Sequence, residues 1–79
     1  GKSLLPSGIT AVEGRFNSGD VVRIMGPDGR EFARGLSNYD SHEAKRIKGL
    51  NSAEIDEVLG HKYYDEFVHR DNMALVKNG

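Results

Sequence analysis

The strongest local constraint in this 79-residue chain is the stretch VVRIMGPDGREFARGL at residues 21–36. Its first run is rich in β-branched residues, which favour strands. In the central GPDG, Pro27 fixes φ at the start of a turn and Gly29 relieves the backbone where the chain leaves it. In the second run, Phe32 and Leu36 share one face, because side chains alternate along a strand. Residues 21–36 therefore predict a β-hairpin.

Two further strand regions flank this hairpin in the sequence. Residues 9–16, ITAVEGRF, have the content of a strand that is weakened or bulged at Gly14. Near the other end, FVHRDNMALV at residues 67–76 has β-rich flanks around Arg70-Asp71-Asn72, which are turn-tolerant residues. We therefore expect 9–16 to be a strand and 67–76 to be a closing hairpin.

The residues between these strand regions predict two short helices. Asp40 and Glu43 have the spacing of a capping box, and Gly49 is a natural stop for the helix that follows. The second helix is expected to be capped by Ser52 and stopped by Gly60. Its apolar stripe consists of Ile55, Val58 and Leu59. Helices of this length are not stable alone, so both are expected to pack on the strands.

The predicted element order is β-β-β-α-α-β-β in a single domain spanning residues 1–79. Two short helices on a small, strongly bent sheet indicate an α+β fold that is mainly β, arranged as a pseudo-barrel. A chain this short has a modest core. It has no cysteine, which fits a reducing compartment. No apolar run approaches the ~20 residues of a membrane span, so no membrane partner is expected.

The tripeptide His69-Arg70-Asp71 matches the catalytic loop of protein kinases, but the rest of that loop is missing. The loop has the form H-R-D-x-x-x-x-N, and its metal-binding Asn would fall at position 76, which is Val76. No glycine-rich phosphate loop is present. The three histidines, His42, His61 and His69, lack a metal-binding spacing. We therefore expect no catalytic, cofactor-binding or metal-binding residues in this chain.

Charge gives a weaker constraint on partners. The formal net charge is −1, which argues against avid nucleic-acid binding. Residues 29–48 carry five basic and three acidic side chains, whereas residues 49–71 carry two basic and six acidic ones. This distribution is compatible with a mildly basic face beside an acidic one, or with two ordinary solvated surfaces.

Several segments together resemble a known family. GKSLLPSGI, GRFNSGDVVRI and GREFARGLSNYDS are similar to PUA domains in general, and SNYDS, SAEIDEVLG and VHRDN are similar to the C-terminal PUA domain of bacterial glutamate 5-kinases. PUA domains usually have a strand and a helix ahead of the G-x-S-L-L-P segment, with which this chain starts. The resemblance therefore implies a PUA-like pseudo-barrel that lacks the family's first strand and helix.

The resemblance also implies a function for the parent protein. The parent would be a cytoplasmic, ATP-dependent glutamate 5-kinase of proline biosynthesis, with ATP and Mg bound in a kinase domain outside these residues. The domain itself would have no catalysis and no cofactor of its own. It would act as a regulatory or scaffolding part through contacts with the kinase domain and neighbouring subunits.

The alternative that the resemblance implies is a module that binds structured RNA weakly. In RNA-binding PUA domains the contacts fall near segments that match Gly1 to Leu5 and Ala33 to Gly35 here. The expected RNA-binding residues are Lys2, Ser3, Arg34, Gly35, Lys45 and Arg46, the last two as electrostatic neighbours. From the residues alone, Gly35 marks either a close approach of a ligand to the backbone or a bulge or tight bend.

Overall fold

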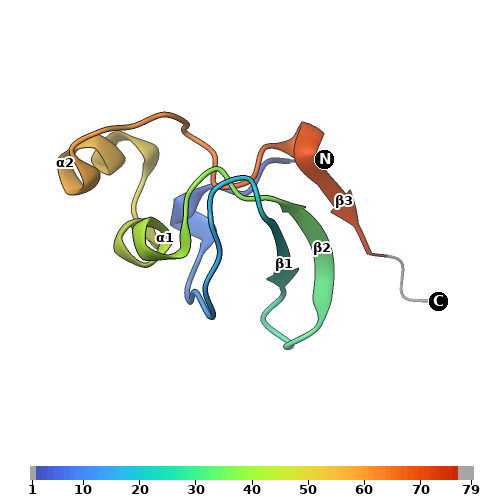
Figure 1. Ribbon diagram of the computed structural model, residues 1–79. Helices are drawn as coiled ribbons and strands as arrows, with labels where there is room; N and C mark the ends of the chain where they lie inside the picture. The colour runs from blue at the N-terminus through green and yellow to red at the C-terminus, as the bar shows by residue number, and fades with distance from the viewer. Residues whose placement is uncertain (1, 77–79) are drawn as a thin grey trace.

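The computed structural model describes residues 2–76 and has a sheet at one end and helices at the other (Figure 1). The strands are β1 (Val21–Met25), β2 (Glu31–Leu36) and β3 (Met73–Leu75), and the helices are α1 (Ser41–Ile47) and α2 (Ile55–Leu59). Short 3-10 turns, η1 (Pro6–Gly8), η2 (Ser52–Glu54) and η3 (Arg70–Asn72), connect them. The predicted α+β class is confirmed.

The predicted hairpin forms the centre of an antiparallel sheet with the order β1-β2-β3. Its turn closes through a 2.8 Å hydrogen bond from the Gly26 N–H to the Arg30 carbonyl, and Gly29 has a φ of +80°. Ile24 pairs with Ala33 but Met25 pairs with Glu31, so β2 carries one extra residue at this point. The resulting bulge lies next to the turn.

Gly35 lies in regular pairing between Val22 of β1 and Met73 of β3, so the bulge considered for it in the sequence is wrong. An added Cβ would lie 2.4 Å from Cγ1 of Val68 and 2.8 Å from the carbonyl oxygen of Asn72. The close approach that the glycine permits is therefore made by residues 68–72 of the same chain.

The strand predicted at residues 9–16 is not present, and this expectation is corrected. Phe16 instead exchanges hydrogen bonds with the start of α1: its N–H donates to Oγ of Ser41, and its carbonyl accepts from the Ser41 N–H. Ile9, Val12 and Phe16 are partly buried against the core. The β-branched side chains of this segment thus pack on the core without a strand partner, because strand propensity largely reflects a fit to a half-buried surface.

The prediction of a closing hairpin at residues 67–76 is also wrong. Val68 forms an isolated antiparallel bridge with Leu4, whereas β3 pairs with β2. The two halves of the segment therefore have different partners, and η3 turns the chain from one to the other. The turn at 70–72 was predicted correctly, but long-range partners replaced the local pairing.

The helix ends follow the sequence closely. The Asp40–Glu43 capping box is present at α1, and Gly49 and Gly60 have φ values of +79° and +78° after the two helices. The second helical segment differs in its cap, which is Asn51 with Glu54 rather than Ser52. Ser52 instead donates its hydroxyl hydrogen to the Asp65 carbonyl.

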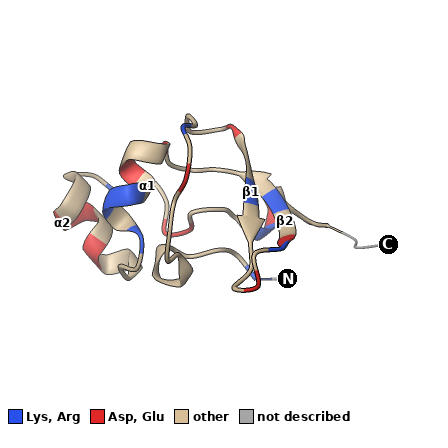
Figure 2. Cartoon of the chain, turned by 90° about the horizontal axis from the view of Figure 1, so that it is seen from below, with Lys and Arg blue, Asp and Glu red and all other residues tan. Residues whose placement is uncertain are grey.

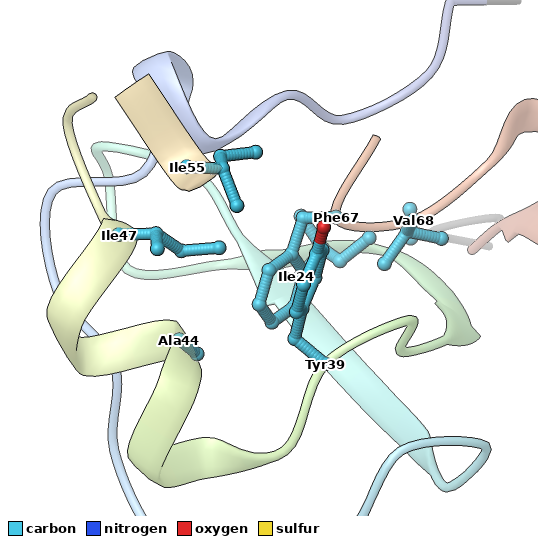
Figure 3. Packing of buried hydrophobic residues seen from close by; sticks show 8 residues of the cluster. Ile24, Tyr39, Ala44, Ile47, Ile55, Phe67 and Val68 are labelled. Carbon is cyan, nitrogen blue, oxygen red and sulfur yellow. The ribbon is translucent and has the colours of Figure 1, made fainter. Parts of the chain in front are cut away.

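The core lies between the sheet and the helices (Figure 3). Phe67 is central: its ring stacks on Tyr39 at 6.4 Å and meets Phe16 edge-on at 6.2 Å. The Tyr39 hydroxyl donates to the Tyr64 carbonyl, so this buried polar group is satisfied. The buried apolar residues are Ile24, Ala33, Tyr39, Ala44, Ile47, Ile55, Phe67 and Val68.

We predict that Gly35→Ala destabilises the domain by about 1–3 kcal/mol, because the new methyl group overpacks against Val68 and the Asn72 backbone. Urea unfolding followed by circular dichroism measures the change. The control is Gly8→Ala, whose Cβ would make only an ordinary 3.9 Å contact with Leu4, so a change within about 0.5 kcal/mol is expected. Equal stability of the two variants would contradict the close approach at Gly35.

Candidate interaction surface

Four of the six residues expected to bind RNA lie on neighbouring segments of the chain at the sheet, but the exposed Arg34 side chain points away from the core, whereas Gly35 faces it. The Ser3 hydroxyl accepts a 2.8 Å hydrogen bond from the Arg70 N–H, and the Leu4 N–H donates to the Val68 carbonyl at 2.9 Å. Segment 2–4 therefore runs beside segment 68–70, and Val68 of that segment lies against Gly35. This arrangement brings Lys2 and Ser3 close to the strand that carries Arg34 and Gly35. Gly1 lies outside the described residues.

The other two expected residues lie elsewhere. Lys45 and Arg46 belong to α1, and Figure 2 shows the basic residues of this helix well apart from those on β1 and β2. The Arg46 guanidinium donates to the Val58 carbonyl, so it also joins α1 to α2. The structure thus divides the six residues into a group at the sheet and a pair on the helices.

The face of β1 and β2 that points away from the core carries exposed apolar side chains. We call it the outer sheet face and define it by Val21, Met25, Phe32 and Leu36 with the charged residues Arg23, Glu31 and Arg34. Val21 remains 64% exposed and pairs in register with Leu36 on the neighbouring strand. Exposed apolar clusters of this kind are typical of surfaces that contact another molecule.

Glu31 is the charged centre of this face. It forms ion pairs with Arg34 and, at 3.5 Å, with Arg23 of the neighbouring strand. The hydrogen bond from Arg34 lowers the pKa of the Glu31 carboxyl, and the same bond raises the pKa of Arg34. Sequence reasoning missed this role, because residues three apart in a regular strand point to opposite faces. The extra residue at the bulge places Glu31 on the same face as Arg34.

Two of the shallow hollows on the surface of the described residues border residues expected to bind RNA. One, of about 310 Å³, lies at the end of the outer sheet face and is lined by Val21, Arg34, Gly35, Leu36 and residues 71–74. The other, of about 480 Å³, lies beside α1 and includes Arg15, His42 and Lys45. Its two carboxylates already hold backbone N–H groups: Asp20 accepts from Asn17, and Asp40 accepts from Glu43. Ser41 and His42 also line this second hollow, but the Ser41 hydroxyl accepts from the Phe16 N–H, and among the described residues no hydrogen bond joins it to His42.

The His-Arg-Asp tripeptide is part of a surface turn. His69 Nδ1 accepts a hydrogen bond from the Asp71 N–H at 3.1 Å, and the Asp71 side chain is 78% exposed. Among residues 2–76, no three His, Asp or Glu side chains are grouped as metal ligands would be. Within the same residues, no helix has the length and apolar content needed to cross a bilayer.

Comparison with known proteins gives consistent matches. The family model for the PUA domain matches residues 1–59. Proteins named glutamate 5-kinase from Trichlorobacter lovleyi, Syntrophotalea carbinolica and Caldanaerobacter subterraneus are 60%, 57% and 52% identical over 76, 77 and 79 residues. These matches cover 96%, 98% and 100% of this chain but only 20%, 21% and 21% of the relatives. The chain thus spans about a fifth of the length of these relatives, in their C-terminal part.

We predict that Glu31→Gln lowers stability at neutral pH and lowers it less in acid. The folded-state pKa of Glu31 is lowered, so its stabilising contribution is present above the unfolded value of about 4.3 and is lost as pH falls through the folded value. The difference in urea midpoint between the two proteins should therefore be seen at pH 7 and shrink progressively as the pH is lowered below the unfolded value. It should also shrink in 1 M salt, because both arginine side chains are more than half exposed and salt screens their charges. A difference that persists unchanged in acid would contradict the ion-pair account.

Proposed function

Since this chain belongs to the PUA domain family, we propose that it is the non-catalytic C-terminal domain of a glutamate 5-kinase and has a regulatory or scaffolding role there. The observation that carries the proposal is identity of 52–60% over nearly the whole chain to proteins of that name. The whole enzyme would use ATP and Mg to phosphorylate the γ-carboxylate of glutamate, as the first step of proline biosynthesis in the cytoplasm.

In this proposal the kinase part would carry out the catalysis, and the present domain would make packing contacts with other parts of the enzyme. ATP, Mg and glutamate would bind to the kinase part, outside these residues. The present domain would supply exposed apolar surface, such as Val21 and Phe32, against which another part of the enzyme packs. Its partners would be the kinase part of its own polypeptide and neighbouring subunits.

The test compares a full-length enzyme that carries these residues with a version that lacks both these residues and the strand and helix that PUA domains usually have ahead of them. We expect the shortened enzyme to keep glutamyl phosphate formation within about tenfold, a change of about 1.4 kcal/mol or less in the activation barrier. Its melting temperature should fall by about 2–4 °C for each kcal/mol of lost contact. Loss of all turnover in a shortened enzyme that remains folded would assign chemistry to this domain. If the full-length and shortened enzymes have identical turnover and identical melting temperatures, the domain has no scaffolding role.

A second function, weak binding of structured RNA, is favoured by the convergence at the sheet end. Lys2 and Ser3 lie beside segment 68–70, and the exposed side chain of Arg34 lies on the neighbouring strand β2. Gly35 is covered by Val68 and the Asn72 backbone, so its core-facing side is not free for a ligand. Lys45 and Arg46 would add charge from α1. With a net charge of −1, such a domain can neutralise only a few phosphates, so the logarithmic salt slope of binding should be about 2–4.

We predict that Lys2→Gln combined with Arg34→Gln lowers this slope by a little under one for each lost phosphate contact. The pair Lys45→Gln and Arg46→Gln tests the α1 group in the same way. Lys62→Gln is the control, because Lys62 is ion-paired with Asp65 at 2.9 Å, as Arg34 is with Glu31, but is not among the residues expected to bind RNA. Filter retention of a structured RNA across a salt series measures the slope. An unchanged slope in both pairs, or no retention at low salt, would rule out this surface.

A further inference from the structure

We propose that the outer sheet face is the surface on which the rest of the same polypeptide docks; this inference rests on the proposed function. Its four apolar members, Val21, Met25, Phe32 and Leu36, are between 39% and 64% exposed. They come from two paired strands, so they share one rigid surface. A small sheet that has its core on one face would ordinarily carry polar residues on the other. Here the second face is largely apolar around its three charged residues.

The position of the chain's first described residues favours this occupant. In the relatives, about four-fifths of the protein lies outside the matched region, which is their C-terminal part. In a parent of this kind the preceding chain therefore enters at Lys2, and Figure 1 shows this end beside the sheet, away from α2. Segment 2–4 is held there by the Leu4–Val68 bridge. A partner tethered at this point has a high effective concentration at the sheet end.

The charges on the face indicate what the docked surface must offer. Arg23 and Arg34 share the single carboxylate of Glu31, which leaves an excess positive charge among the apolar side chains. Burial of an unpaired guanidinium is costly. The docking surface of the partner should therefore combine apolar side chains with a carboxylate or free carbonyl oxygens placed opposite these arginines.

The chain contains no cysteine, which permits a direct test by thiol labelling. Val21→Cys and Tyr63→Cys are introduced separately into the full-length enzyme and reacted with iodoacetamide. The labelled peptide is then quantified by mass spectrometry. Tyr63 is the matched control: it is 73% exposed, against 64% for Val21, and lies in the loop after α2. Each rate is divided by the rate of the same site in urea, which removes local effects on thiol reactivity.

We expect the Val21→Cys thiol to be labelled about tenfold or more slowly than the Tyr63→Cys thiol, because docking excludes the reagent. Equal normalised rates would overturn the inference. If the deletion described above still lowers the melting temperature, the scaffolding proposal survives this failure and only the docking face is wrong.

Slower labelling at Tyr63→Cys alone would place the docking surface elsewhere. Protection that is lost on hundredfold dilution would identify a second copy as the occupant, and protection lost on ribonuclease treatment would identify RNA; either result would overturn the commitment to the same polypeptide.

Discussion

The close packing of segment 67–72 on Gly35 is the constraint on which the rest of the structure depends. Phe67 fills the middle of the core, Val68 lies against Gly35, and the Asn72 backbone passes where a side chain of residue 35 would be. The same segment holds Leu4 on its other side. One glycine therefore allows three parts of the chain, the start, the central hairpin and the last strand, to meet at the sheet end. Without this contact, the hairpin would lack its third strand and the core would lack its central aromatic ring.

Structural features that depend on residues close together in the sequence could be predicted well. The hairpin of β1 and β2 follows from β-branched runs on either side of GPDG, and the start of α1 follows from the Asp40–Glu43 spacing. The strand predicted at residues 9–16 and the hairpin predicted at residues 67–76 were wrong, because strand propensity does not specify which strand a segment pairs with. Their side chains suit a half-buried extended segment, but whether that segment pairs, and with which strand, depends on contacts far along the chain. The Leu4–Val68 bridge has no local signal of any kind.

The candidate surface shows the same difference between local features, which the sequence predicts, and contacts between distant parts of the chain, which it does not. The sequence indicated the sheet end through Lys2, Ser3, Arg34 and Gly35, and the fold does bring their segments together. It also grouped Lys45 and Arg46 with them, although α1 lies apart from the strands. The role of Glu31 could not be read from the residues, because it depends on a bulge that changes which side chains share a face. The charge composition predicts a basic region, whereas the register of the paired strands determines which charged side chains contact one another.

The third strand has a consequence for synthesis on the ribosome. β3 consists of Met73–Leu75, so β2 has an unpaired edge until the last described residues have emerged. Residues 21–36 can form their hairpin early, but the core remains without Phe67 and Val68 for about thirty further residues, or a few seconds at ~5–20 residues per second. During that interval the nascent chain presents a bare strand edge beside exposed apolar residues, a combination that favours pairing with other chains. Arg34, at the centre of β2, places a charge on that edge strand and so opposes such pairing during translation.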